Sequence, residues 1–254
     1  MRTRSSQDSI AEASRWHAEG SHHGGAGAGG WISPFDGRQA ASFLSAPGDL
    51  AIINRPPEGL PDFDVGMAWN ARVVEEEKAL FGLFFKRKVE RSVAVDMDIG
   101  CLYELRSGAR GAVQAFGETR GAFDEPPYLF LDGDERTGES DGRDEVIHIN
   151  GARWDEIRKI LVYTYIYGGA DSFGLVRPQV QLHMPDEKPV VITLNSRRSE
   201  LALCAVATIE NIRGGIRLTT HMEYFPGHGA MDRAFGYGLE WEQGAKPPVN
   251  QSGA

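Results

Sequence analysis

The stretch DGDERTGESDGRDE, residues 132–145, holds seven carboxylates in fourteen positions, with only Arg136 and Arg143 to balance them. Its net charge is −5, while the net charge of the whole 254-residue chain is −9. Like charges this close together repel one another unless water or a cation separates them. The stretch therefore predicts a site for a positively charged ligand, with a solvated acidic turn as the alternative.

A strand-like segment upstream of the acidic stretch supplies two more carboxylates, Asp96 and Asp98. Side chains alternate between the two faces of a strand, so both aspartates point the same way, about 7 Å apart. The opposite face is apolar and consists of Val93, Val95, Met97, Ile99 and Cys101. A cation shared by the two aspartates would relieve their repulsion.

Calcium is the cation that suits this loop. It takes about six to eight oxygen ligands in flexible geometry, and Gly133, Gly138 and Gly142 let the loop bend around an ion. The EF-hand template fails, because Arg136 and Thr137 stand where a ligand and a glycine are required. Magnesium demands tight octahedral geometry and usually retains water, so a flexible loop crowded with carboxylates favours calcium.

Short runs rich in Val, Ile, Tyr and Phe surround these carboxylates, and Gly, Pro and Asp turns separate the runs. Examples are FDVGMAW, EVIHIN, KILVYTYIY and GIRLTTHMEYF. About ten such runs at this spacing predict an all-β sandwich or barrel. Two segments could be helical instead: WDEIRK at 154–159 as one turn, and VVEEEKALFGLFFKRK at 73–88 as a longer helix.

The sandwich is expected to span residues 49–246. Residues 1–48 include the glycine-rich run GSHHGGAGAGG, which has few groups able to bury surface, so a disordered Gly/Ser/His-rich tail is predicted there. A second disordered tail is predicted at 247–254. Cys101 and Cys204 lie in apolar runs and are expected to be buried, reduced thiols.

Three segments together resemble the TerD-domain family of tellurium-resistance and stress proteins: VAVDMDIGCLYEL, FLDGDERTGESDGRDE and IRKILVYTYIYGGA. The C-terminal EYFPGHGAMDRAFGYGLEW is similar to the TerA branch. The resemblance covers residues 49 to about 244. It implies a two-sheet β-sandwich that binds one or two calcium ions at the acidic loop, has no established catalytic activity and acts with other tellurium-resistance proteins.

The family loop has the form GDNxTGxGDGDDE, and this chain departs from it at two positions: Glu135 replaces Asn, and Arg143 replaces Asp. An arginine beside a cation costs affinity, so one of two ion sites would be weakened here. The expected metal ligands are Asp96, Asp98, Asp132, Asp134, Glu135, Glu139, Asp141, Asp144 and Glu145. Spacing alone leaves open which oxygens share one ion.

Enzymatic interpretations fit less well. GESDG at 138–142 matches the G-x-S-x-G nucleophile elbow, but no helix is expected after it, and seven carboxylates would destabilise an oxyanion. His221, Glu223 and His228 match no zinc motif and are expected to be structural. The chain is therefore predicted not to be an enzyme. The alternative is a metal-dependent hydrolase that holds a catalytic ion with the same acids.

Composition limits the partners. A sequence pI near 5.3 and the lack of a basic stripe argue against nucleic acid. The N-terminus has no apolar signal region, so a cytoplasmic protein is expected. ALFGLFFKRK at 79–88 could touch the inner membrane or a partner protein, with an ordinary packed hairpin or helix as the alternative. The residues of this surface are Phe81, Phe84, Phe85, Lys86, Arg87 and Lys88.

Overall fold

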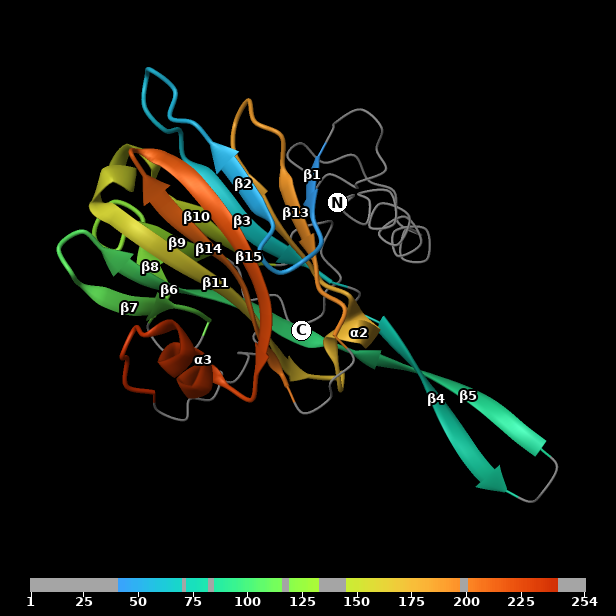
Figure 1. Cartoon of the computed structure of the whole chain (residues 1–254). Coiled ribbons are helices and arrows are strands. Elements are labelled where there is room, and N and C mark those ends of the chain that lie inside the picture. Colours follow the sequence, from blue (N-terminus) through green and yellow to red (C-terminus); the bar gives the residue numbers. More distant parts are fainter. Residues whose placement is uncertain are drawn as a thin grey trace, which may run out of the picture.

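Two β-sheets packed face to face form the body of the protein, and a long two-stranded hairpin projects from it (Figure 1). The structure is a computed structural model, and it describes residues 41–69, 72–81, 85–115, 119–132, 145–196 and 201–241. The predicted all-β sandwich is confirmed.

The first sheet has seven strands in the order β1-β13-β12-β3-β10-β9-β8. Their bounds are β1 Ser42–Leu44, β3 Phe63–Ala68, β8 Gly121–Ala122, β9 Leu129–Asp132, β10 Glu145–Ile149, β12 Gln179–His183 and β13 Val190–Thr193. All neighbours are antiparallel except β1 and β13, which are parallel. β1 lies inside the segment predicted to be a tail, because its backbone pairs with β13; the sandwich thus begins before residue 49. Residues 1–40 and 247–254 lie outside the described residues.

The second sheet has six antiparallel strands in the order β2-β15-β14-β11-β6-β7. Their bounds are β2 Leu50–Ile53, β6 Asp96–Leu105, β7 Arg110–Val113, β11 Ile157–Gly168, β14 Leu203–Ile212 and β15 Gly215–Phe225. The side chains that these strands and the first sheet turn inward form one apolar core between the two sheets. Phe63 and Trp154 meet edge to face there, with ring centroids 5.4 Å apart.

A second apolar cluster covers part of the outer face of the second sheet. It joins Leu102, Leu161, Tyr163 and Phe225 to Met231 of α3, which spans His228–Phe235. Asp232 anchors the chain that follows the helix: its carboxylate accepts the backbone N–H groups of residues 238 and 239 at 2.7 Å and the Trp241 indole N–H at 2.9 Å. The C-terminal segment thus closes over the sheet, which the strand pattern did not predict.

The segment 73–88, for which the sequence left a helix or a hairpin open, is not a helix. The segment forms the antiparallel hairpin of β4 Arg72–Phe81 and β5 Phe85–Ala94. Ten register pairs, from Arg72 opposite Ala94 to Phe81 opposite Phe85, satisfy both backbones, whereas an isolated helix this short is marginal in water. The predicted turn at 154–159 is a 3₁₀ helix, η1 Gly151–Glu156, that leads into β11; a short α2, Phe173–Val176, follows β11.

Candidate metal site

The acidic loop connects two neighbouring strands of the first sheet. β9 ends at Asp132 and β10 begins at Glu145, and the antiparallel register sets Asp132 opposite Val146. The two ends differ in environment: the Asp132 side chain is 71% exposed, whereas Glu145 is buried. The carboxylate at the start of the loop, Asp132, is therefore in water, and the one at its end, Glu145, is in the interior.

Glu145 reaches from one sheet to the other. It has the same parity as Ile147 and Ile149, which belong to the core between the sheets. Its Oε2 atom accepts the backbone N–H of Ile99 in β6 at 2.6 Å. β7 pairs with residues 101–104 of β6 and does not reach Ile99. The Glu145 carboxylate therefore accepts an N–H that a neighbouring strand would otherwise accept.

Asp98 is the residue next to that contact. Strand alternation places Met97 and Ile99 in the core, as predicted, and turns Asp98 to the outer face, opposite Tyr165 of β11. Asp98 is nevertheless 3% exposed, because this part of the outer face is covered. Asp96 lies two residues earlier and is half-buried. The fold thus brings the buried carboxylates of Asp98 and Glu145 to the same end of β6.

Tyr163 stands beside both carboxylates. An atom added at Gly100 as a Cβ would lie 2.5 Å from the Tyr163 ring, so the ring lies flat against the glycine that follows Ile99. The Tyr163 hydroxyl donates to Gln114 Oε1 at 2.7 Å. Burial raises the pKa of Tyr163 well above its usual value, and the charges of Cys101, Asp98 and Glu145 raise it further. The phenol therefore stays neutral next to the two acids.

Oxygen ligands of this kind fit calcium better than a soft metal. In the part of the chain that the structure describes, no three His, Cys, Asp or Glu side chains gather closely enough to hold an ion. The remaining predicted ligands lie outside the described residues, as does Ser140 of the elbow-like GESDG; these ligands are Asp134, Glu135, Glu139, Asp141 and Asp144. Further oxygens would have to come from that loop.

At the start of the loop, the structure shows a cluster of polar side chains that the sequence did not predict. His148 of β10 lies between two aspartates: its Nδ1 atom is 2.7 Å from Asp64 Oδ1, and its Nε2 atom is 3.7 Å from Asp132 Oδ2. Asp64 belongs to β3, and the register sets it opposite His148. The pairing of Asp64 with His148 depends on a register that the local sequence does not reveal.

The thiols and the C-terminal histidines lie in packed surroundings. Cys101 and Cys204 are buried and free, as predicted, and burial raises the pKa of the Cys101 thiol to about 12. His221 lies against Phe235 and within 2.6 Å of the Thr208 hydroxyl. His228 packs on Tyr163, and burial lowers its pKa to about 4. Such groups suit neither thiolate chemistry nor proton transfer near neutral pH.

The predicted membrane or partner surface lies on the hairpin. Phe81 pairs with Phe85 at the end of the ladder, and Lys86, Arg87 and Lys88 follow in β5; Phe84 lies outside the described residues. None of the helices that the structure describes is long and apolar enough to cross a membrane.

Comparison with known proteins finds a tellurium resistance homologue. No family model matches the chain. The tellurium resistance protein TerA of an Alcaligenes species is 40% identical over 168 residues, which are 66% of this chain and 48% of that protein. Over these 168 residues the chain is a homologue of this TerA-like tellurium resistance protein. The family resemblance predicted from the sequence is thereby confirmed, and the chain spans about half the length of this TerA-like relative.

A solved structure is similar as well. A crystal structure described as that of a protein of unknown function, SAV2460, is 16% identical, with a TM-score of 0.44, and covers 68% of this chain and 95% of its own. With a TM-score this low, this similarity carries no argument about the present chain.

Proposed function

We propose that this chain is a calcium-binding, non-enzymatic protein of a tellurium-resistance or stress response. The observation that carries the proposal is the burial of two carboxylates at the same end of β6: Asp98 within that strand, and Glu145 where the acidic loop joins β10. Burying charged carboxylates costs several kcal/mol unless they are paired, hydrogen-bonded or bound to a metal. A divalent cation shared with the loop would offset that cost.

Asp98 and Glu145 would be the fixed ligands, with Asp96 and Asp132 at the more exposed side. Glu145 is held by the Ile99 N–H, so its second oxygen is oriented before an ion arrives. Calcium supplies charge neutralisation there. It would join β6 of one sheet to β10 of the other, and thereby stabilise the sandwich.

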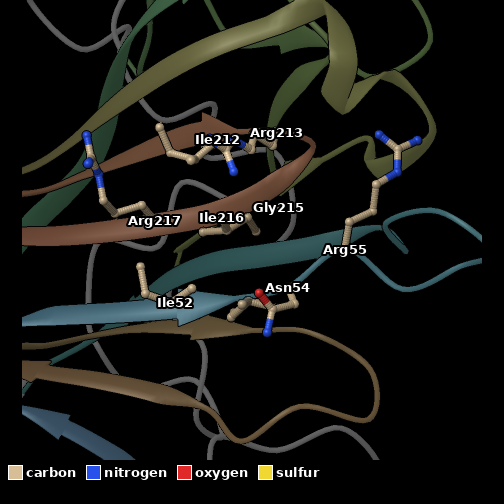
Figure 2. Close-up of a pocket in the computed structure, with 9 residues that line it drawn as sticks. Ile52, Asn54, Arg55, Ile212, Arg213, Gly215, Ile216 and Arg217 are labelled. Atoms are coloured by element: carbon tan, nitrogen blue, oxygen red, sulfur yellow. The ribbon is translucent and has the colours of Figure 1, made fainter.

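A structural ion agrees with the surroundings of these acids better than a catalytic one does. The cavity of about 220 Å³ drawn in Figure 2 lies at β2 and β15, and none of its lining residues is acidic. The neutral Tyr163 phenol and the high-pKa thiol of Cys101 offer no base or nucleophile at neutral pH. We therefore propose that the chain acts by presenting surfaces in the cytoplasm, either to other tellurium-resistance proteins or, through the hairpin, to the inner membrane.

Thermal unfolding of chelator-treated protein tests the proposal. Calcium at about 100 times its dissociation constant should add about 2.7 kcal/mol to the free energy of unfolding. Magnesium at the same concentration should add less. Asp98→Asn and Glu145→Gln should lose the calcium response, whereas Glu104→Gln, which alters a buried carboxylate elsewhere, should keep it. Equal melting temperatures with and without calcium would refute the proposal.

A further inference from the structure

β2 is the last strand of the second sheet among the strands that the structure describes. It pairs with β15 on one side only, through residues Leu50 to Ile53. Ile53 is buried in the core, but Leu50 and Ile52 are 57% and 62% exposed on the outer face. Edge strands are usually protected by a lysine, a proline or a bulge, and LAII contains no such residue. An unprotected apolar edge of this kind is a template for another strand.

A small cavity adjoins this edge. It has a volume of about 220 Å³ and lies between the end of β2 and the turn that joins β14 to β15 (Figure 2). Ile52, Ile212 and Ile216 supply an apolar lining. Arg55, Arg213 and Arg217 line it as well, and no lining residue is acidic, although the chain as a whole carries a net charge of −9. The lining itself is therefore positively charged, although Asp155 and Glu210 beside it pair with Arg55 and Arg217.

Contacts with neighbouring residues hold the arginines close to β2. Arg55 lies across the turn at Gly214, where a Cβ would come within 2.6 Å of its guanidinium, and Arg55 also contacts Asp155 at 2.7 Å. Arg217 forms an ion pair with Glu210 at 2.6 Å. Arg213 occupies the turn itself with a φ of 55°, a left-handed conformation that ordinarily favours Asn or Gly. The turn would be easier to form without an arginine at this position.

We propose that β2 accepts an extended segment of a partner protein as an additional strand, with an apolar centre against Leu50 and Ile52 and acidic residues beside Arg55 and Arg213. Backbone hydrogen bonds along the edge would supply affinity, and the arginines would select the charge. A second copy of this chain fits less well. Residues 49–55 hold one acidic side chain, Asp49, and its carboxylate already accepts the backbone N–H groups of Ser45 and Ala46, so pairing β2 with itself would mainly add arginines to an edge that already has them.

A peptide titration tests this interface. The probe is a fluorescently labelled peptide, acetyl-DEVTVTV-amide, and its charge-reversed counterpart is acetyl-KKVTVTV-amide. We expect the acidic peptide to bind and the basic peptide not to bind. Ile52→Glu should abolish binding, because it places a charge at the centre of the edge. Arg213→Asn should weaken binding about tenfold, which corresponds to the loss of one charged contact worth about 1.4 kcal/mol.

The chain contains a matched control. Arg177 also has a left-handed φ, 49°, at the end of α2, and it does not line the cavity. Arg177→Asn should leave peptide binding unchanged. Both Asn variants should melt at or above the wild-type temperature, because Asn tolerates the left-handed region better than Arg. Loss of binding in Arg213→Asn therefore could not be attributed to unfolding.

Three results would overturn the proposal. They are equal binding of the acidic and basic peptides, no binding of either, and a concentration-dependent dimer that Ile52→Glu abolishes, since that dimer would show a second copy on the edge. The titration is run with chelator and again with calcium. Binding that is the same in both conditions supports the edge whether or not the calcium proposal holds.

Discussion

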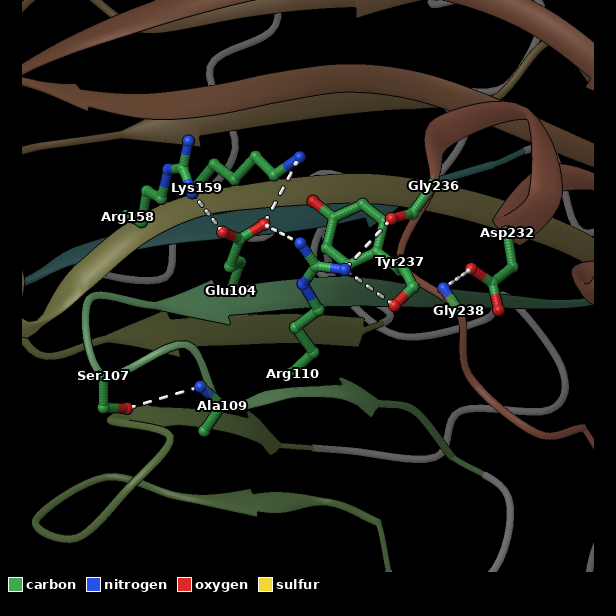
Figure 3. A network of polar contacts seen from close by, with 10 residues as sticks. All are labelled: Glu104, Ser107, Ala109, Arg110, Arg158, Lys159, Asp232, Gly236, Tyr237 and Gly238. Atoms are coloured by element: carbon green, nitrogen blue, oxygen red, sulfur yellow. Dashed lines mark hydrogen bonds and ion pairs between the residues drawn. The ribbon is translucent and has the colours of Figure 1, made fainter.

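Glu104→Gln should destabilise the protein by removing a carboxylate around which three cations gather. The Glu104 side chain is only 4% exposed, and its oxygens lie 2.5 Å from Arg158, 3.3 Å from Arg110 and 3.6 Å from Lys159 (Figure 3). Arg110 also donates to the carbonyl of Tyr237 at 3.2 Å, and Lys159 lies over the Tyr237 ring. The substitution thus affects both the sheet and the C-terminal segment that covers it.

The magnitude follows from burial and screening. Removing one partner of a buried ion pair costs about 3–5 kcal/mol. Here Arg158 and Arg110 are 63% and 40% exposed, so water screens part of their repulsion, and the glutamine oxygen can still accept a hydrogen bond. We therefore expect a loss of about 2 kcal/mol in the free energy of unfolding. For a domain of this size, that corresponds to a fall of about 4–8 °C in melting temperature.

Urea unfolding followed by tryptophan fluorescence measures this loss. Glu210→Gln is the matched control, because Glu210 lies on the same face but pairs with a single cation, Arg217, and is more exposed. Its loss should stay below about 1 kcal/mol. Equal losses for the two variants, or a Glu104→Gln variant as stable as wild type, would refute the reasoning.

The pH dependence gives a second readout for Glu104. Burial alone would raise its pKa, but Lys159, Arg110 and Arg158 together hold the pKa below its ordinary value of 4.5. The unfolded chain therefore takes up the proton at higher pH than the folded chain does. The stabilisation is complete above about pH 4.5 and is lost as the pH falls through the lowered pKa. The difference in the free energy of unfolding between wild type and Glu104→Gln should therefore shrink as the pH falls below about 4.5.

Two further predictions concern packing on the outer face of the second sheet. Gly100→Ala should cost about 1–3 kcal/mol, because the new methyl group would overlap the buried Tyr163 ring, whereas Gly168→Ala, where the space is open, should cost almost nothing; equal melting temperatures for the two would contradict this. Because burial lowers the pKa of His228 from 6.5 to about 4, the unfolded chain binds the proton first, and stability should fall as the pH drops from 6.5 towards 4. The stability of His228→Phe should depend less on pH in that range. An NMR titration that gives the His228 imidazole a pKa near 6.5 would contradict this prediction.

Strand alternation predicted the face of each residue in β6 but not its environment. Met97 and Ile99 lie in the core as the pattern indicates. Asp98 lies on the opposite face, as expected, yet it is buried, because that face is partly covered by elements far away in the sequence, such as α3. A period of two tells which residues share a face; only the tertiary arrangement decides whether the face meets water.

Register and long-range pairing explain the other differences. The sequence did not decide between a helix and the hairpin of β4 and β5, because VVEEEKALF carries no clear period and the ladder becomes apparent only once the partner strand is known. The contact between Asp64 and His148 depends in the same way on how β3 and β10 align. Family resemblance predicted the sandwich, and the local pattern predicted that Asp98 and the acidic loop belong together; the hydrogen bond from Ile99 to Glu145 required the fold.

Calorimetric titration of chelator-treated protein with calcium tests the central claim most directly. We expect wild-type protein to bind one or two calcium ions with measurable heat and to bind magnesium more weakly. Glu145→Gln and Asp98→Asn should each lose a calcium ion while staying folded. Absence of calcium binding to folded wild-type protein, or unchanged binding in both variants, would contradict it.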